Sequence, residues 1–599
     1  MKKQDIAILA VLFALWIAWP SVDRVIKKRF FHSTPVAAAE QAVTPVEPAQ
    51  KSAAPAEIES KAVEPAIAEA PVETPAAISV VEEPVSTAPE KTAVLENDML
   101  KVIISSRGAA IVSAELKNYR TSLDPASKPV FLDFDTGRAL AYSGVEGLSA
   151  GSDFDMAASA DGRSVRFERK ASSGLGFSRT ISLSDGYVLK VADELTNETA
   201  AAISVPSHSI QLGPMRSLEG ETPIAGLAAL GVDTLSPGGE KVKYWGAKIP
   251  KGFAATMEEQ NLPKLPVSID WPIDKPVDWV AVKNKYFAQI LTPDGGGEKV
   301  TVHAVRRVLL AEMADPKIKP KSAMVDEISA SILLPELKLG AGEVFARAIQ
   351  YYVGPKKYSE LSKNGLHQVD VMEFGMWAPV GKLLLKIMNW IYSIPLIHSY
   401  GIAIILLTIL VRVVFWPITR KSTESMKKMQ EIQPLVKAVQ AKYKDNTQKQ
   451  QQEVMALYKE HKVNPLGGCL PMLIQIPVFI ALFVVLRSAI ELRFAHFLWI
   501  KDLSQPENLF PGILPFGLSL NLLPIFMAGT MFWQQKLTPS ASADPNQQKI
   551  MMFMPIMMLV MFYNFAAGLA LYWTTQNILM IVQQMLMKRS KAQSSTSKA

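Results

Sequence analysis

Residues 396–418 read LIHSYGIAIILLTILVRVVFWPI, and this run governs how the rest of the chain is interpreted. It has the length of a membrane-spanning helix, since about 20 mainly apolar residues cross a hydrocarbon core of about 30 Å. Arg412 is its only Lys, Arg, Asp or Glu before Pro417. Because a charge at the centre of a span costs about 2.5–3.5 kcal/mol on insertion scales, Arg412 is a candidate functional residue.

The alternative for Arg412 is a role at the membrane boundary. It lies six residues before Ile418, about 9 Å along a helix, and an Arg side chain can extend most of that way to water. Thr408 shares its helical face, and Gln475 and Gln576 fall in other apolar runs. Polar residues in spans usually face a bundle interior or a wet cavity, so a shared polar groove is expected. Interhelical hydrogen bonds without a cavity are the alternative.

Further apolar runs predict six spans in total. Residues 396–588 are expected to form a five-span core, with the later spans at residues 466–486, 513–533, 550–565 and 567–587. Residues 366–395 are short of apolar length and predict an amphipathic helix lying in the interface. Residues 1–32 predict an uncleaved signal anchor, because no small-x-small cleavage site follows the apolar run directly. A cleaved signal peptide is the alternative.

The chain between the first span and the core divides in two. Residues 33–92 contain nine prolines, no glycine and no aromatic residue, which predicts an extended tether. Residues 93–365 hold short alternating segments separated by Gly, Asp, Ser and Pro, which predict an all-β sandwich. The expected strands include Val165–Arg169, Phe177–Leu183, Tyr187–Val191, Trp279–Ile290 and Phe345–Val353.

The distribution of charge predicts the orientation. Residues 419–465 hold ten Lys or Arg against five acids, and the tail at residues 589–599 is also basic. Basic loops lie on the cytoplasmic side, so both termini are expected inside and residues of about 30–370 outside. The loop at 419–465 predicts a helical hairpin with a basic outer face that includes Lys427, Lys428 and Lys437. Ribosomal RNA or anionic lipids are candidate partners, and a merely solvated face is the alternative.

Methionines crowd the fifth and sixth expected spans. Together with Phe479, Met554 and Met558 predict an apolar surface along which varied hydrophobic guests slide, because Met side chains are flexible and polarisable. Ordinary lipid-facing packing is the alternative.

Several function classes lack the residues that they need. The single cysteine, Cys469, excludes an intramolecular disulfide and a zinc site built on paired cysteines. The outer domain has no GxGxxG, no P-loop and no cluster of His with carboxylates. No catalytic residue, metal or cofactor is therefore expected. The spans hold no chain of Asp, Glu or His, which disfavours a proton-coupled transporter.

Four motifs resemble the YidC family of membrane protein insertases. They occur in the order and spacing of that family across residues 370–590. They are Val411-Arg412 with Trp416–Thr419, Asn464–Pro471 (NPLGGCLP) with Gln475–Phe479 (QIPVF), Asp544-Pro545 with Gln547–Ile550, and Gly568–Trp573 (GLALYW) with Asn577.

The resemblance implies a non-enzymatic insertase and chaperone in the bacterial inner membrane. It implies the Gram-negative form, in which the outer domain is a periplasmic β-supersandwich. The groove arginine of the family falls on Arg412, with Thr408 and Trp573 facing the groove. Implied partners are nascent inner-membrane proteins, the Sec translocon with its accessory subunits, and the ribosome. A small-solute transporter and an envelope enzyme acting on glycans through the β domain are the competing hypotheses.

Overall fold

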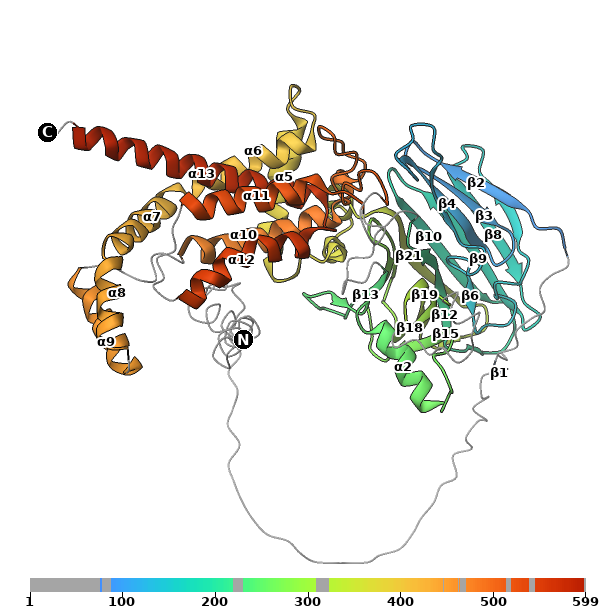
Figure 1. Ribbon diagram of the computed structural model, residues 1–599. Coiled ribbons are helices and arrows are strands. Elements are labelled where there is room, and N and C mark those ends of the chain that lie inside the picture. Colours follow the sequence, from blue (N-terminus) through green and yellow to red (C-terminus); the bar gives the residue numbers. More distant parts are fainter. Residues whose placement is uncertain are drawn as a thin grey trace, which may run out of the picture. The chain divides into compact units, whose positions relative to one another are not determined.

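The computed structural model describes residues 76–77, 88–218, 230–308, 323–444, 446–461, 463, 470–512, 519–537 and 545–596 (Figure 1). All of its elements belong to one compact unit, Glu73–Ala599. The expected signal anchor, most of the tether and the motif at residues 464–469 lie outside the described residues.

The N-terminal half of the described residues is a β domain. Within the described residues its strands form four sheets, and every pairing in the largest sheet is antiparallel. The order in that sheet is β14 (Lys243–Tyr244), β13 (Gly231–Leu235), β16 (Trp279–Lys283), β17 (Phe287–Pro293), β21 (Val344–Pro355), β10 (Val188–Asn197), β9 (Leu175–Leu183), β8 (Ser164–Lys170) and β7 (Asp155–Ala158).

Three smaller sheets complete the domain. The second has the order β15 (Ser268–Ile273), β18 (Lys299–Arg306), β19 (Val325–Leu334), β12 (His208–Arg216) and β6 (Tyr142–Ser143). The third has β2 (Thr92–Glu96), β3 (Leu100–Ser105), β4 (Ala110–Arg120) and β5 (Pro129–Asp133), and the fourth has β1 (Ala76–Ala77), β11 (Ile203–Val205) and β20 (Leu337–Leu339). One helix, α2 (Ile249–Glu259), packs on β15.

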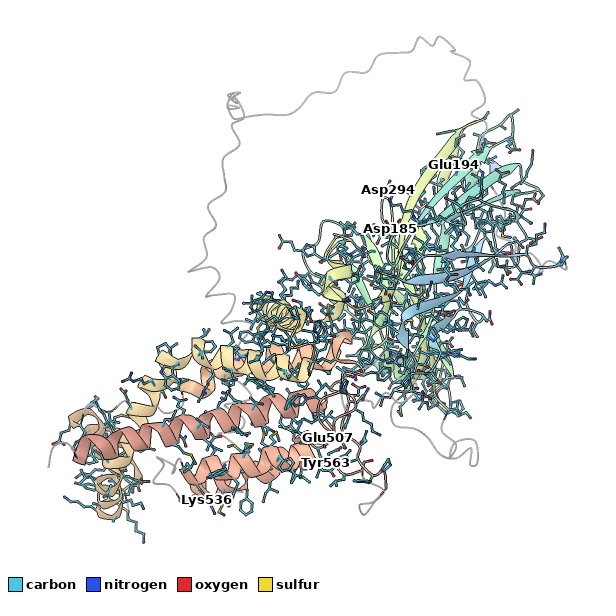
Figure 2. The ribbon with its side chains drawn as sticks, turned by 90° about the horizontal axis from the view of Figure 1, so that it is seen from above. Asp185, Glu194, Asp294, Glu507, Lys536 and Tyr563 are labelled. Atoms are coloured by element: carbon cyan, nitrogen blue, oxygen red, sulfur yellow. The ribbon has the colours of Figure 1, made fainter. Side chains whose placement is uncertain are left out.

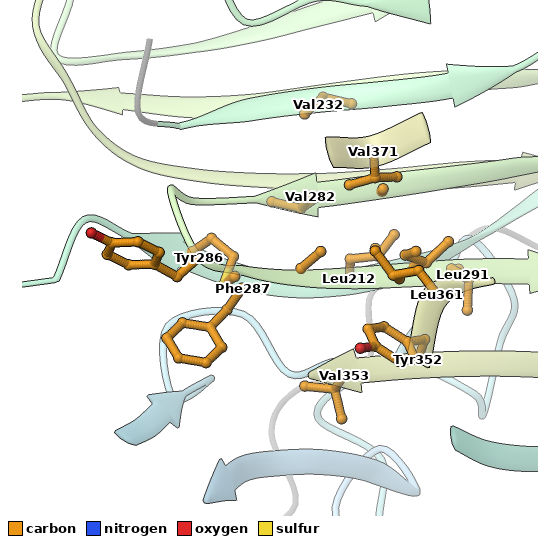
Figure 3. Close-up of a cluster of buried hydrophobic side chains, with 14 of the residues drawn as sticks. Leu212, Val232, Val282, Tyr286, Phe287, Leu291, Tyr352, Val353, Leu361 and Val371 are labelled. Carbon is orange, nitrogen blue, oxygen red and sulfur yellow. The ribbon is translucent and has the colours of Figure 1, made fainter. Parts of the chain in front are cut away.

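The largest and second sheets face each other. Strand β12 of the second sheet contacts β16 and β17 of the largest sheet, and β19 of the second sheet contacts β16. Figure 3 shows the apolar layer between them, which includes Leu212, Val282 and Leu291, all fully buried. Burying one such side chain stabilises the fold by about 1.5–3 kcal/mol. The prediction of an all-β domain is confirmed, because strands in four sheets make up this domain within the described residues, apart from α2.

One predicted strand, Trp279–Ile290, is wrong as a single element. The structure divides it into β16 and β17, joined by a tight turn at residues 284–286. Oδ1 of Asn284 accepts hydrogen bonds from the backbone N–H groups of Tyr286 (3.1 Å) and Phe287 (2.8 Å), and these bonds stabilise that turn. Both strands are almost wholly buried, and the polar run Lys283-Asn284-Lys285 was the signal in the sequence that marks the break between them.

Helices follow the β domain. The short α4 (Tyr358–Leu361) leads to α5 (Ala378–Ser393), and the helical core consists of α6 (Tyr400–Val414), α10 (Leu470–Ser488), α11 (Leu522–Leu537), α12 (Pro545–Phe562) and α13 (Ala567–Thr596). In this core α13 packs on α6, α10 and α11, while α12 packs on α11 (Figure 1). Helix α5 packs on α6 and α10 through Leu385 and Met388, which are fully buried.

Among the residues described here, none of the helices combines the length and the apolar character needed to cross a membrane.

The helix boundaries differ from the expected runs at two places. Within residues 396–418 only Tyr400–Val414 is one helix, because Phe415 leaves helical geometry before Trp416-Pro417 starts α7 (Trp416–Glu431). Helix α11 begins at Leu522, nine residues after the expected start at Ile513. Its first N–H groups, on Leu522 and Leu523, donate to the Glu507 carboxylate at 2.6 and 2.9 Å.

The N-terminal end of α11 and the C-terminal end of α12 are tied together by polar contacts. Asn521 Nδ2 donates to the Tyr563 carbonyl at 2.8 Å, and the Tyr563 hydroxyl donates to Ser519 O at 2.8 Å. Figure 2 places Glu507 and Tyr563 together at this end of the core, whereas Lys536 lies near the other end of α11.

The basic loop forms α7, α8 (Gln433–Lys442) and α9 (Thr447–Glu460), and α8 packs on α9 (Figure 1). Pro434 stands in the first turn of α8, where its missing N–H costs nothing, and the loop divides into α7 and α8 at Ile432. Met429, Ile432 and Val463 form a small core with Tyr458 packed against it.

Candidate functional site

Arg412 lies near the C-terminal end of α6 and is 8% exposed. Its Nη2 donates to Oε1 of Gln583 on α13 at 2.6 Å. Its Nε has no hydrogen-bond partner, and no acid within the described residues forms an ion pair with it. A buried charge without a counter-charge is costly to the fold, because no ion pair offsets its desolvation.

A second group of polar side chains joins α10 to α13. Gln475 Nε2 donates to the Tyr572 hydroxyl, and Gln576 Nε2 donates to Gln475 Oε1 at 3.3 Å. Tyr572 is 2% exposed and Gln576 is 8% exposed. These contacts are made between neighbouring helices, where paired polar groups replace contacts with water.

One face of α13 connects these two groups. Tyr572, Gln576 and Gln583 are four and seven residues apart, spacings that put side chains on one side of a helix. We call Arg412, Gln475, Tyr572, Gln576 and Gln583 the polar cluster. It is assembled from α6, α10 and α13, and Gln583 Nε2 has no hydrogen-bond partner among the described residues.

Glycines allow the loop that follows α10 to pack closely on α6 and α13. A Cβ at Gly401 of α6 would lie 2.1 Å from Phe497, so only glycine fits there. A Cβ at Gly568, in the first turn of α13, would lie 3.0 Å from the Leu503 carbonyl oxygen. Asn577 fixes α13 to α11 by donating to Thr530 Oγ1 at 3.2 Å.

Two expected groove residues lie beside the cluster without bonding to it. Thr408 is fully buried, and its hydroxyl donates to the Ile404 carbonyl of its own helix at 2.6 Å. Trp573 packs edge-on against Phe479 with ring centroids 4.7 Å apart. Gln475 and Gln576, both named from the sequence, are joined by a hydrogen bond, and Arg412 bonds to Gln583 on the helix that also carries Gln576. The direct partners Tyr572 and Gln583 were missed as site residues.

The expected apolar surface is only partly exposed. Phe479, Met554 and Met558 are half-buried and pack against the core. The exposed face of α12 presents other residues, namely Met552, Phe553, Ile556, Met557, Val560 and Met561. A cavity of about 340 Å³ between α11 and α12 is lined by apolar side chains, including Phe532, Met552 and Ile556, and holds no member of the polar cluster.

The basic residues chosen from the hairpin are partly described. Lys428 and Lys437 are exposed, and the side chain of Lys427 lies outside the described residues. Within the described part of the chain, no group of three His, Cys, Asp or Glu could hold a metal ion.

A buried ionic group lies where the β domain meets the segment before α5. Lys283 Nζ donates to Asp233, to Val371 O at 3.0 Å and to Glu373 Oε1 at 2.7 Å. Burial raises the pKa of the Asp233 carboxyl to about 7, although Lys283 works against that shift. The group ties β13 and β16 to η1 (Gln368–Met372), and Oδ1 of Asp233 has no hydrogen-bond partner among the described residues.

The sequence comparisons first define a class. Residues 390–594 match the family described as "60Kd inner membrane protein", and residues 92–387 match the family described as "YidC periplasmic domain". The chain therefore combines an inner-membrane protein of the 60Kd class with a periplasmic all-β domain.

Curated relatives then identify the family. A protein of Pelobacter propionicus, "Membrane protein insertase YidC", is 32% identical over 518 residues, which cover 84% of this chain and 88% of that protein. Its counterpart in Syntrophus aciditrophicus is also 32% identical, over 86% and 87% of the two chains. One in Syntrophobacter fumaroxidans is 40% identical over 53% of this chain and 55% of its own length. The chain belongs to the YidC family of membrane protein insertases, which are not enzymes.

Solved structures resemble the chain more weakly. "Active YidC insertase crystal structure with the first transmembrane domain resolved" is 18% identical and covers 85% of this chain and 94% of that chain, with a TM-score of 0.32. A galactose mutarotase-like protein from Lactobacillus casei is 12% identical and covers 44% and 100%, with a TM-score of 0.28. The family assignment rests on the sequence matches.

Proposed function

We propose that this chain inserts nascent inner-membrane proteins through a groove centred on the polar cluster. The observation that carries the proposal is the buried guanidinium of Arg412, which has a single neutral partner, Gln583. A structural ion pair would normally satisfy such a charge. Arg412 instead keeps a positive charge available for a polar or acidic segment on its way outward.

The membrane arrangement that we propose has six spans with both termini in the cytoplasm. Residues 1–32 are the first span, 33–92 a tether, 93–365 the periplasmic domain and 366–395 an interfacial helix. Residues 396–588 are the five-span core, with the hairpin 419–465 and the tail 589–599 in the cytoplasm. The apolar runs of the sequence and the excess of Lys and Arg in the hairpin support this arrangement.

In this mechanism the guest divides between two surfaces. Its polar terminus or loop enters beside Arg412, Gln475 and Gln576, with Thr408 and Trp573 in the groove wall, which shortens the apolar path that it must cross. Its apolar segment passes along Phe479, Met554 and Met558 into lipid, where each buried CH₂ group contributes about 0.8 kcal/mol.

The partners that we propose follow from these surfaces. Nascent chains are the clients, alone or through the Sec translocon and its accessory subunits. Exposed Lys428 and Lys437, with Lys427, suit contacts with ribosomal RNA or anionic lipids.

Site-specific crosslinking tests the groove directly. A photoreactive amino acid replaces Gln475 in the polar cluster or, as a control, Trp390, which is 65% exposed on α5. A stalled one-span substrate should form an adduct at position 475 and little at position 390. Equal adducts at both positions, or an adduct only at position 390, would contradict the groove.

A further inference from the structure

The turn between β16 and β17 reaches the loop that follows α10. The Tyr286 hydroxyl lies 2.8 Å from Ser504 Oγ, and Lys285 Nζ donates to the Ser504 carbonyl at 3.2 Å. Tyr286 is 1% exposed, and Figure 3 shows its ring directed away from the other labelled side chains of the β core. We call residues 489–505 the outer loop; it contains η4 (Ile490–Leu492).

The hydrogen bonds at this contact form a directed chain. Ser504 Oγ donates to Asp502 Oδ1 at 2.6 Å, so the Ser504 hydroxyl must accept from Tyr286. Gln505 Nε2 in turn donates to the Tyr286 hydroxyl at 3.4 Å. Each group in this series of hydrogen bonds has a matched partner, and consecutive hydrogen bonds strengthen one another in a buried site.

The same outer loop supplies the cap of α13. The N–H groups of Ala567 and Gly568 donate to the carbonyls of Gln505 and Leu503, each at 2.8 Å. The first four N–H groups of a helix have no partner within it, so these two bonds complete the first turn of α13. Ser504, which Tyr286 holds, lies between the two capping residues.

A second contact fixes the outer loop to a different part of the β domain. Arg493 donates to the Arg120 carbonyl at 2.7 Å and to the Thr121 carbonyl at 3.3 Å, at the end of β4. Its guanidinium also lies 5.4 Å from the centroid of the Tyr286 ring. The loop is therefore held at both of its ends.

We propose that Tyr286 is a positioning residue for membrane insertion. By holding Ser504 it fixes the carbonyls that cap α13, and thereby the axial position of that helix. Tyr572, Gln576 and Gln583 of the polar cluster all lie on α13, and Tyr572 is one helical turn from Gly568. The β domain thus helps to register the polar cluster against Arg412 and Gln475, an inference that rests on the proposed function.

Hydrogen exchange on the full-length chain in liposomes tests the link without any insertion assay. The variants are Tyr286→Phe, Ser504→Ala and their combination. Tyr351→Phe is the control, because it removes a buried hydroxyl that donates to Gln289 inside the β domain. The amides of residues 567–571 should exchange about fivefold faster in each single variant than in the wild type. The double variant should exchange no faster than either single variant, and the control should exchange at the wild-type rate.

Insertion of a one-span substrate is then measured with the same proteins. Tyr286→Phe should slow insertion about two- to fivefold, and Tyr351→Phe should not. Unchanged exchange at residues 567–571 in the single variants would overturn the link between Tyr286 and α13. So would an increase in the exchange rate of the double variant that equals the product of the increases in the two single variants. Faster exchange with unchanged insertion would overturn the positioning role. A wild-type chain that inserts nothing would refute the proposed function while leaving the exchange result interpretable.

Discussion

Two buried arginines, one in the β domain and one in the helical core, have opposite surroundings. Arg179 is fully buried, and its Nε and Nη2 donate to both carboxylate oxygens of Asp193 at 2.7 and 2.8 Å. Its Nη1 donates to the carbonyls of Ala109 and Leu140 at 3.1 and 2.6 Å. Among the described residues, Arg412 has only Gln583 as a hydrogen-bond partner. A fully satisfied charge holds a fold together, whereas an incompletely satisfied one is a sign of function.

The largest expected effect is a loss of stability when Arg179 loses its partner Asp193. Asp193→Ala would leave Arg179 as an uncompensated buried charge and strand the Tyr142 hydroxyl, which donates to Asp193 at 2.7 Å. We expect a loss of about 3–5 kcal/mol of stability, measured by urea unfolding of the full chain.

The control for that prediction is an exposed ion pair in the same sheet. Glu168→Ala removes the partner of Arg166, and the two side chains are 60% and 50% exposed. Such pairs contribute less than about 1 kcal/mol. Equal losses in Asp193→Ala and Glu168→Ala would show that the Arg179 network is not a structural anchor.

His208 is a second buried and fully hydrogen-bonded group of the β domain, and it should make the stability depend on pH. Its Nδ1 donates to the Pro206 carbonyl at 2.9 Å and its Nε2 accepts from Arg347 Nη1 at 3.1 Å, which fits the neutral ring. Burial lowers the pKa of His208 to about 4. As pH falls from 6.5 to 4 the unfolded chain takes up a proton that the folded chain refuses, so stability should fall by up to about 3 kcal/mol.

Urea unfolding midpoints across that pH range measure the effect. His208→Gln, which does not titrate, should remove this part of the slope even if it is less stable throughout. An unchanged slope in His208→Gln would place the acid sensitivity elsewhere.

A smaller loss of stability is expected at Gln475, whose hydrogen bonds within the polar cluster join neutral groups. Gln475→Leu removes the contacts with Tyr572 and Gln576, at a cost of about 1 kcal/mol, and should slow insertion. Ser393→Ala is the control, since its exposed hydroxyl donates only to the nearby Trp390 carbonyl. A loss of stability above about 3 kcal/mol in Gln475→Leu would make Gln475 a structural residue.

The sequence predicts much of this fold because its patterns are local. Alternation in Val165–Arg169 and Phe345–Val353 marks strands that the structure contains as parts of β8 and β21. The turn within Trp279–Ile290 was missed, although the polar run Lys283-Asn284-Lys285 interrupts the apolar stretch and Asn284 makes the bonds of the turn. The break at Pro434 likewise depends on where the preceding helix ends.

The site was predictable to a lesser degree. Arg412 is visible as a lone charge in an apolar run, but its partner Gln583 lies 171 residues away on α13. Which polar residue of α13 meets Arg412 depends on the rotation of one helix against another, which apolar composition does not specify. The shared spacing of Tyr572, Gln576 and Gln583 is a signal in the sequence that could have found Tyr572 and Gln583.

Substitution of Arg412 with two readouts tests the account most directly. Arg412→Met and Arg412→Lys are reconstituted, and insertion of a one-span substrate and urea unfolding are measured on the same preparations. We predict that Arg412→Met changes stability by less than about 1 kcal/mol and slows insertion at least about tenfold. Arg412→Lys should keep most insertion, because only one guanidinium nitrogen bonds to Gln583. Normal insertion by Arg412→Met, or its loss of more than about 3 kcal/mol of stability, would contradict the account.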